Sequence, residues 1–425
     1  MKKKLLFVAL YLQTGGVEKS LLSLLSTLDD ERYEIDLCLF DYTGVLMDQI
    51  PKRVNLLPPI FESYATPLRQ AIPILFKKRL FRLLFAKLFA AGLGVFARGF
   101  GTGARWTVYR YALKRLDKTY DVAVGYLDFF CNYYVMEKIN AKKKIVYNHM
   151  DYTYGMKTGW PCPRLDRKAF RMCDAIVTVA ESARASLVAF FPEAAKKIHV
   201  IHNTVSRDMI QGLARKPMVT AFKDHPAAYK VVTVARLVPE KGVWLALETC
   251  LRLKEQEMDL AWFWIGGGPL YERLTSRIKA QGLGDCFYLL GECKNPYPYM
   301  AAGDLYVQPS MTEAHCVAVE EAMALRRPII ATNIPAFQNQ IRQGETGLIA
   351  EANAESLAGK IKQCLEASEL RKVLSEHLSM AHRYQHDIDK FNALITDREN
   401  LNGGGENSGD PSHRRGGIYR QPYGY

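Results

Sequence analysis

Two acidic side chains, Glu313 and Glu321, flank an apolar stretch within the segment PSMTEAHCVAVEEAMALRRPIIAT. Good helix formers occupy residues 317–326, Pro328 prevents the helix from continuing, and residues 329–332 are typical of a short buried strand. We therefore expect Glu321 about one turn inside the helix and Glu313 in the loop before it. Two carboxylates that meet at a helix N-terminus are arranged to grip a ligand, although surface glutamates also occur at this spacing by chance.

Cationic and glycine-rich loops follow other predicted strands in the same half of the chain. Arg236 and Lys241 come after the run VVTVA, and the glycine run GGGPL at residues 266–270 follows LAWFWI. By themselves, the two cations are typical of solvated loop charges and the glycines of close strand–helix packing. At the carboxyl end of a strand, opposite a helix N-terminus, Arg236 and Lys241 instead indicate a clamp for a diphosphate.

The whole chain of 425 residues alternates short apolar runs with helical periodicity, in two successive series. The first series ends near His202, and the second begins at Lys230 with KVVTVARL. This alternation predicts parallel sheets covered on both faces. We therefore predict an α/β fold of two Rossmann-like, doubly wound domains that face an interdomain cleft, where ligands of such sheets bind.

The composition excludes several classes of protein. The nine cysteines are odd in number, scattered and without metal-ligand spacing, which indicates reduced thiols of a cytoplasmic protein. No uncharged apolar stretch approaches the ~20 residues needed to span a bilayer. The opening MKKKLLFVALYLQTGG has features of a signal peptide but lacks a small-residue cleavage site, and it leads into a predicted strand, glycine turn and helix.

In order and spacing, these motifs resemble the retaining glycosyltransferases of family 4, which have the GT-B fold of two Rossmann-like domains. The resemblance is strong over residues 230–352 and weaker over 1–205. Its most specific element is the E-x(7)-E signature from Glu313 to Glu321, followed by EAMALRRPIIAT and GETGLIA. It implies transfer of a hexose-type sugar from a nucleotide-diphosphate sugar to an acceptor hydroxyl, with retention of anomeric configuration.

The resemblance also implies roles for individual residues. Arg236 and Lys241 would hold the donor diphosphate and stabilise the leaving group. Glu321 would accept hydrogen bonds from the ribose hydroxyls, and Glu313 would contact the donor sugar. The other implied donor contacts are glycine turns, backbone N–H groups at the helix start and a strand-end histidine: Gly15, Gly16, Gly267, Gly268, His315, Cys316, Val317 and His149. The pair Gly15–Gly16 is also typical of a tight turn alone, and His149 of a structural histidine.

Some positions depart from the family pattern. Ala314, His315 and Cys316 replace the residues usual after the first signature acid, and Gln340 stands where the family often has an acid. These positions line the sugar end of the expected pocket. They therefore bear on which sugar the donor carries more than on the type of reaction.

We expect neither a metal nor another cofactor. Transferases of the other major fold often hold Mg²⁺ or Mn²⁺ with an Asp-x-Asp triplet after a strand. Here the only such triplet is Asp387 to Asp389, in the helical C-terminal region. Arg236 and Lys241 are expected to neutralise the diphosphate instead.

The net charge of +13 is concentrated in residues 68–118, which hold twelve Lys or Arg and one acid. Within them, residues 72–116 mix Phe and Leu with cations. This pattern fits a solvated helix face, but it also fits contact with an anionic membrane surface. No nucleic-acid-binding motif accompanies the charge.

A transferase with such a segment would act at the inner face of the plasma membrane on a lipid-linked glycan, in surface polysaccharide assembly such as capsule, O-antigen or exopolysaccharide biosynthesis. Two alternatives are a GT-B-like nucleotide-sugar epimerase or hydrolase and a non-catalytic assembly protein that keeps the fold. The predicted division of the chain is an acceptor domain, a donor domain, a helical segment that packs back on the first domain and a disordered tail: residues 1–205, 206–385, 386–401 and 402–425.

Overall fold

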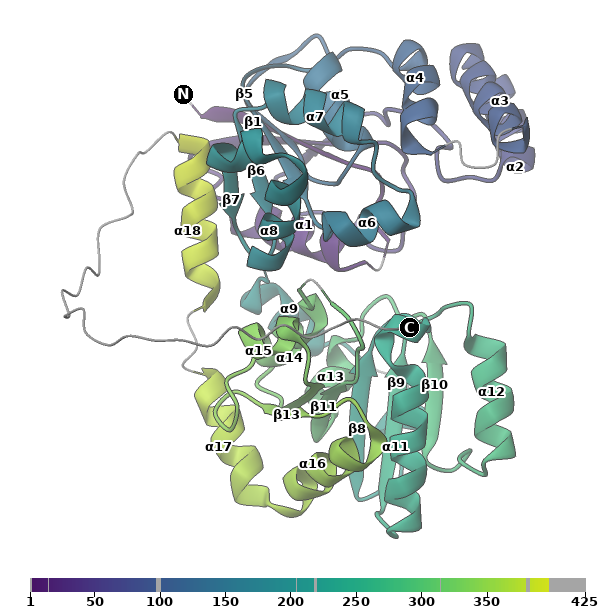
Figure 1. Cartoon of the computed structure of the whole chain (residues 1–425), viewed down its shortest axis with the longest axis vertical. Coiled ribbons are helices and arrows are strands. Elements are labelled where there is room, and N and C mark those ends of the chain that lie inside the picture. The colour runs from purple at the N-terminus through teal and green to yellow at the C-terminus, as the bar shows by residue number, and fades with distance from the viewer. Residues whose placement is uncertain are drawn as a thin grey trace, which may run out of the picture.

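Two α/β domains are stacked one above the other in a computed structural model of the chain (Figure 1). The structure describes residues 2–13, 15–96, 101–203, 205–217, 220–313, 315–379 and 383–396. The predicted disordered tail therefore lies outside the described residues, as does Ala314.

The first domain is built on a seven-stranded parallel sheet in the order β3-β2-β1-β4-β5-β6-β7. The strands that the first series of apolar runs predicted are present, whereas β3 was not predicted because two residues are too short to form such a run. Leu6 and Val8 of the first strand face one core cluster, whereas Leu5 and Phe7 face another, as the two-residue period of a strand requires. The strands are β1 (Lys3–Ala9), β2 (Tyr33–Leu39), β3 (Asn55–Leu56), β4 (Thr119–Gly125), β5 (Asn140–Asn148), β6 (Ala175–Thr178) and β7 (Ile198–Val200).

The second domain has a six-stranded parallel sheet in the order β10-β9-β8-β11-β12-β13. Every side chain of β9 is buried, because helices cover both faces of the sheet. The doubly wound α/β architecture predicted for both halves is confirmed. The strands are β8 (Tyr229–Val234), β9 (Leu260–Ile265), β10 (Phe287–Gly291), β11 (Leu305–Gln308), β12 (Ile329–Thr332) and β13 (Leu348–Ala350).

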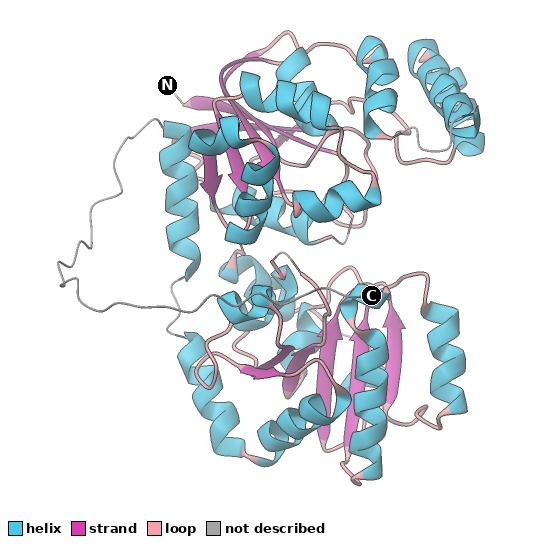
Figure 2. Ribbon diagram, viewed as in Figure 1, coloured by secondary structure: helices cyan, strands magenta, loops and turns pink. Residues whose placement is uncertain are grey.

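Helices pack around the strands of both domains (Figure 2). Those of the first domain are α1 (Gly16–Thr27), α2 (Leu68–Lys77), α3 (Phe81–Phe96), α4 (Thr102–Ala112), α5 (Phe130–Lys138), α6 (Tyr152–Thr158), α7 (Pro163–Met172) and α8 (Glu181–Phe190). Those that follow are α9 (Arg207–Ala214), α10 (Thr220–Lys223), α11 (Val243–Glu255), α12 (Tyr271–Ala280), α13 (Tyr297–Ala302), α14 (Val317–Ala324), α15 (Pro335–Gln340), α16 (Ala354–Glu366), α17 (Ser368–Ser379) and α18 (Arg383–Thr396). Three short 3₁₀ turns are η1 (Met47–Gln49), η2 (Pro192–Lys197) and η3 (Pro239–Lys241).

The chain returns to the first domain at its C-terminal end, where α18 lies alongside the first sheet (Figure 1). Phe391 and Ile395 are buried in a core cluster of that sheet, and the ring of Phe391 lies 6.1 Å from the ring of Phe7. Asp387 pairs with the His202 imidazole at 3.1 Å. Helix α18, which follows the second domain in the sequence, is therefore anchored to the first domain.

Helices α2, α3 and α4 form a layer at the outer edge of the first domain (Figure 1). Leu75, Leu84 and Trp106 bury this layer against the domain core. Its outer side exposes both cations and large apolar side chains, so the basic segment is a folded part of the first domain. In the part of the chain that the structure describes, no helix combines the length and hydropathy needed to cross a bilayer.

One glycine holds the loop that carries Lys241. Gly242 has φ 69°, and a Cβ added there would lie 1.8 Å from the Pro309 carbonyl oxygen. Gly282 has φ 64°, but its added Cβ would meet nothing within 4 Å.

We predict that Gly282→Ala lowers the free energy of unfolding only by the left-handed backbone strain of roughly 1–2 kcal/mol. Gly242→Ala should unfold at a clearly lower temperature because it adds a clash with backbone. Equal midpoints for the two variants in thermal unfolding would contradict this account.

Candidate functional site

The candidate site lies where the first turn of α1 meets the second domain. Gly16 approaches so closely that a Cβ added there would lie 3.2 Å from Val317 Cγ2 at the start of α14. Glu18 lies within electrostatic range of Arg236. Lys19 forms an ion pair with Glu321. One turn of one helix therefore brings together residues that the sequence predicted separately in the two halves of the chain.

The Lys19–Glu321 pair is buried. Lys19 Nζ lies 3.0 Å from both carboxylate oxygens of Glu321, and the two side chains are only 11% and 2% exposed. The Tyr297 hydroxyl donates to Glu321 Oε1 at 2.7 Å, and the lysine ammonium lies 5.1 Å from the centroid of the tyrosine ring. Hydrogen bonds and a cation–π contact thus compensate the desolvation of both charges.

Lys19 and Tyr297 were not predicted as site residues. Lys19 stands three positions after Gly16, in the first turn of a helix that begins at the carboxyl end of β1. A cation in the first turn of the helix after the first strand is the sequence feature from which Lys19 could have been predicted as a site residue. Tyr297 opens α13, and nothing in its local sequence indicates that it faces Glu321.

The second predicted acid is paired as well. Lys241 Nζ lies 2.6 Å from Glu313 Oε1, and Ser310 Oγ donates to the same oxygen at 2.8 Å. Lys241 closes η3 after β8, whereas Glu313 follows β11, the strand beside β8 in the sheet. Adjacent strands therefore bring Lys241, predicted to bind the diphosphate, into contact with Glu313, predicted to bind the donor sugar.

His149 follows β5 and is held on both sides. Its Nε2 lies 2.7 Å from the Tyr126 carbonyl oxygen, which can only accept, so this nitrogen carries the proton. Its backbone N–H lies 3.2 and 3.3 Å from the two carboxylate oxygens of Asp128. Burial lowers the pKa of His149 to about 4, so the imidazole is neutral at neutral pH. The Asn203 side chain lies beside the ring and raises this pKa in part. Among the described residues Nδ1 makes no hydrogen bond of ordinary length and angle, so it presents an acceptor lone pair.

Two acids of the first domain that sequence reasoning missed titrate near neutral pH. Burial raises the pKa of Glu18 to about 7, partly offset by the helix backbone and Arg236. Burial also raises the pKa of Asp128 to about 7, partly offset by the His149 N–H. Perturbed acids are typical of functional sites. Their burial depends on tertiary packing, which gives no local signal in the sequence.

The start of α14 differs in detail from the prediction. The Cys316 backbone N–H, predicted to face the donor, donates to Gln340 Oε1 at 3.0 Å. Gln340 Nε2 in turn donates to the Cys316 carbonyl at 3.0 Å and to Glu320 Oε1 at 2.9 Å. Gln340, noted as a departure from the family pattern, therefore ties α15 to the helix start with a side-chain amide.

The His315 side chain is buried between α14 and the chain that follows β7. Its ring lies 5.4 Å from the ring of His202, and its Nε2 lies 3.6 Å from Glu320 Oε1. Burial lowers the pKa of His315, and Glu320 raises it in part. In this structure His315 contributes packing on the domain connection.

The glycine loop after β9 packs on the loop that carries Arg236. Gly268 has φ 158°, and a Cβ there would lie 2.6 Å from the Leu237 carbonyl oxygen. The Gly267 carbonyl accepts a hydrogen bond from the Leu237 N–H at 2.8 Å. The contact accounts for glycine at 268 by close packing, and it sets the position of the Arg236 backbone.

No three His, Cys, Asp or Glu side chains among the described residues are grouped so as to hold a metal ion. Asp387, the first acid of the Asp-x-Asp triplet, pairs instead with His202 at 3.1 Å and lies 3.7 Å from Lys390.

Two family models match the chain. The model described as Glycosyltransferase Family 4 matches residues 14–208, and the model described as Glycosyl transferases group 1 matches residues 221–378. The first match contains the α1 turn and His149. The second contains Arg236, Lys241 and both signature glutamates.

Curated relatives match over shorter segments. The chain is 29% identical over 182 residues to the putative colanic acid biosynthesis glycosyltransferase WcaL of Escherichia coli (strain K12). The matched segment covers 40% of this chain and 43% of the relative. It is 28% identical over 201 residues to the N-acetylgalactosamine-N,N'-diacetylbacillosaminyl-diphospho-undecaprenol 4-alpha-N-acetylgalactosaminyltransferase of Campylobacter jejuni. This matched segment covers 47% of this chain and 53% of the relative. The chain spans about half or less of the length of the curated relatives it matches.

Solved structures match over nearly the whole length. The crystal structure of Anabaena Alr3699/HepE in complex with UDP-glucose superposes with a TM-score of 0.61 at 16% identity, over 93% of this chain and 98% of that one. At this level of identity, the match shows a shared fold.

The buried pair across the domains gives a stability prediction. Lys19→Met leaves the Glu321 carboxylate buried without its partner, which we expect to cost about 3–5 kcal/mol of the free energy of unfolding. A matched control is Lys294→Met, because Lys294 pairs with Asp48 across the same two domains at 2.6 Å with both side chains at least half exposed. That change should cost less than about 1 kcal/mol.

Denaturant unfolding of both variants measures the difference. In the Lys19→Met background, Glu321→Gln should recover part of the loss because it removes the unpaired charge. Equal costs for Lys19→Met and Lys294→Met would show that the buried pair does not hold the domains together.

Proposed function

The chain belongs to the glycosyltransferases of group 1 and family 4 and has the GT-B fold, and on this premise we propose that it moves a hexose-type sugar from a nucleotide-diphosphate sugar to an acceptor hydroxyl. The observation that carries the proposal is the gathering of two cations and two glutamates in the second domain, next to the α1 turn. Arg236 and Glu321 lie near Glu18 and Lys19 of that turn, and Lys241 pairs with Glu313 where the loops after β8 and β11 meet.

The charges suit the departure of a diphosphate. When the anomeric C–O bond breaks, positive charge develops on the sugar ring and negative charge on the diphosphate oxygen. Arg236 and Lys241 supply fixed positive charge where the negative charge appears, which lowers the barrier. The diphosphate competes with Glu313 for Lys241, and the released Glu313 carboxylate can then accept hydrogen bonds from the donor sugar.

We carry the ribose and sugar contacts over from the family resemblance. Glu321 is 2% exposed between Lys19 and Tyr297, so it would accept hydrogen bonds from the ribose hydroxyls by exchanging one of these partners. His149 Nδ1 would accept one from a sugar hydroxyl. The backbone at Gly15 and Gly16 lets the diphosphate approach the α1 N-terminus. Two solved structures of the same fold are complexes with UDP or UDP-glucose, which supports a nucleotide-sugar donor here.

We propose that the transfer retains anomeric configuration and needs no metal. The acceptor hydroxyl attacks the anomeric carbon from the face of the leaving group as the C–O bond to the diphosphate breaks. The hydroxyl proton passes to a diphosphate oxygen, so charge and atoms balance. The cationic clamp takes the part that a divalent ion would otherwise play.

The acceptor we propose is a lipid-linked glycan at the inner face of the plasma membrane, in surface polysaccharide biosynthesis. Two relatives support this class: one is described as a putative colanic acid biosynthesis glycosyltransferase, and the other is named for transfer to a diphospho-undecaprenol-linked sugar. The basic, apolar layer of α2, α3 and α4 would contact anionic lipid. An epimerase, a hydrolase or a non-catalytic assembly protein is disfavoured because the complete clamp and both signature glutamates are present.

Clamp variants test the reaction. Arg236→Ala and Lys241→Ala should each lower transfer by roughly tenfold or more while the fold stays intact, because each removes a cation from the leaving diphosphate. A screen of nucleotide sugars for thermal stabilisation identifies the donor, and initial rates with it measure the loss. Exposed Lys279, changed to Ala, is the control. Wild-type rates in either clamp variant would overturn the clamp, and loss of wild-type transfer on chelation would overturn metal independence.

Vesicle binding tests the membrane contact. The wild type should bind vesicles that contain anionic lipid, ignore neutral ones and be released by salt, because exposed charges are screened over ~8–10 Å. Changing four exposed cations to Gln should remove about 4 kcal/mol of attraction. The four are Lys77, Lys78, Arg79 and Arg82. A control with four exposed cations of the second domain changed to Gln should still bind. These are Arg215, Lys216, Arg277 and Lys279.

Soluble and lipid-borne acceptors separate the two roles. The fourfold variant of the first domain should keep transfer to a soluble acceptor analogue and lose transfer to a lipid-borne one. Equal vesicle binding by this variant and the wild type at low salt would contradict the membrane contact. The basic segment would then be a solvated helix face.

A further inference from the structure

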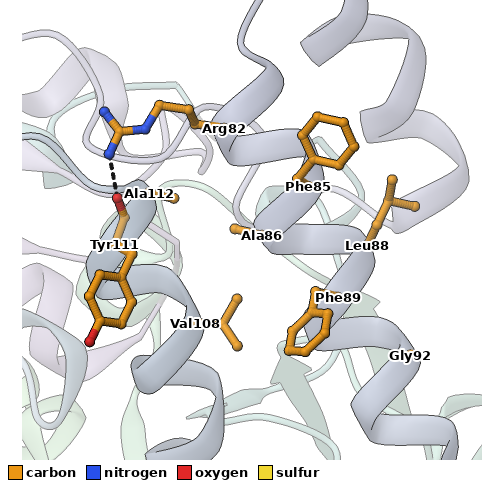
Figure 3. A pocket seen from close by; sticks show the side chains of 9 residues that line it. All are labelled: Arg82, Phe85, Ala86, Leu88, Phe89, Gly92, Val108, Tyr111 and Ala112. Carbon is orange, nitrogen blue, oxygen red and sulfur yellow. Dashed lines mark hydrogen bonds between the residues drawn. The ribbon is translucent and has the colours of Figure 1, made fainter.

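An apolar groove of about 830 Å³ runs between α3 and α4. Figure 3 shows Phe85, Leu88 and Phe89 of α3 on one side and Val108 of α4 on the other, with Arg82 at one end. The side chains that line it are almost entirely apolar. They are Arg82, Phe85, Ala86, Leu88, Phe89, Gly92, Val108, Tyr111 and Ala112.

The walls of the groove expose unusually large apolar surfaces. Phe85 is 68% exposed, Phe89 61% and Tyr111 71%. Exposed aromatic clusters of this kind on a folded domain mark sites that contact a partner, a ligand or a membrane. A flat bilayer surface would touch the outer rings, but it would not fill a recess floored by Ala86 and Ala112. The shape therefore calls for a slender apolar group that enters between the helices.

The size limits the ligand. Pockets for small ligands span about 300–1,000 Å³, so the groove has room for part of a hydrocarbon chain. Because it is bounded by one pair of helices, it suits a single chain better than the paired chains of a phospholipid.

Cations gather at the Arg82 end. Burial lowers the pKa of Lys138, and the charges of Arg115, Arg110 and Arg82 lower it further, which places the four cations close together. Glu137 neutralises part of this charge through Arg110 at 3.1 Å. The Arg82 guanidinium donates to the Tyr111 carbonyl at 2.5 Å, which uses one of its five N–H donors. An anionic group at this end would meet a positive potential.

The inner face of α4 leads toward the transfer site. The ring of Tyr109 lies 6.3 Å from that of Tyr64. Burial raises the pKa of Tyr64, and Tyr11 is among the neighbours that raise it further. Burial also raises the pKa of Tyr11, with Glu18 raising and Arg236 lowering it. A short series of contacting or neighbouring groups thus connects the groove helix with the clamp.

We propose that the groove between α3 and α4 binds the prenyl chain of a lipid phosphate, with the phosphate at the Arg82 end. This inference rests on the proposed lipid-linked acceptor and adds that the protein holds the chain itself, apart from the bilayer surface. The apolar walls bury one hydrocarbon chain, and the neighbouring cations bind its anionic head.

Binding of short prenyl phosphates in the absence of membranes tests the proposal. Farnesyl phosphate and geranylgeranyl phosphate, used below their micelle concentrations, should bind the wild type by calorimetry, the longer chain more tightly. Inorganic phosphate should not bind detectably. Val108→Trp should weaken farnesyl phosphate binding by about tenfold or more, because the indole fills the groove and removes apolar contact. Thr107→Trp places the same side chain at an exposed position of α4 outside the groove lining and should bind as the wild type does.

A second pair of ligands tests the head group. Arg82→Gln should weaken farnesyl phosphate but leave farnesol unchanged. Binding that is absent in the wild type, or equal in Val108→Trp and Thr107→Trp, would overturn the proposal. Loss of anionic vesicle binding in Val108→Trp would overturn it too, because the groove would then be part of a general bilayer contact. Failure of the proposed function would show differently, as no stabilisation by any nucleotide sugar while prenyl phosphates still bind.

Discussion

The site depends on a single charge pair buried between two domains. Lys19 and Glu321 both lose most of their water, which costs several kcal/mol for each ion unless close contacts compensate. The tyrosine hydroxyl and ring at 297 supply part of that compensation. Because these contacts tolerate little displacement, they fix the first turn of α1 against α14. The approaches of Gly16 to Val317 and of Glu18 to Arg236 then follow, since these residues share one helical turn.

Burial at this junction also sets the protonation of its neighbours. Low water content raises the pKa values of Glu18 and Asp128 to about 7 and lowers that of His149 to about 4. Neutral forms are therefore accessible for all three groups near neutral pH. Lys19 and Lys241 are paired with Glu321 and Glu313 in the same conformation. In the proposed reaction a diphosphate would bind Lys241 only by displacing Glu313, which would link donor binding to a rearrangement of this pair.

Much of this could be predicted from sequence, and the limits have physical reasons. Parallel buried strands give near-continuous apolar runs, so twelve of them and the helix at Val317 were predictable, whereas the two residues of β3 gave no pattern. The loops after β8 and β11 could be paired in principle because both follow strands of one sheet. The partners of Glu321 could not, because Lys19 lies 302 positions away and reaches it only through the packing of two domains. The family resemblance assigned the Cys316 N–H to the donor, whereas in this structure it donates to Gln340 Oε1.

The distribution of charge separates two tasks within one fold. The site cations Arg236 and Lys241 lie in the loop after β8, where they act on the nearby carboxylates Glu18 and Glu313. Lys77, Arg79 and Arg82 are exposed on the outermost helical layer. In the proposed function their potential would attract anionic surfaces over about a Debye length. Helix α4 belongs to both regions, since Val108 and Tyr111 line the groove while Trp106 and Tyr109 pack into the domain core. A ligand in the proposed groove would therefore lie against the same helix whose Tyr109 ring contacts Tyr64.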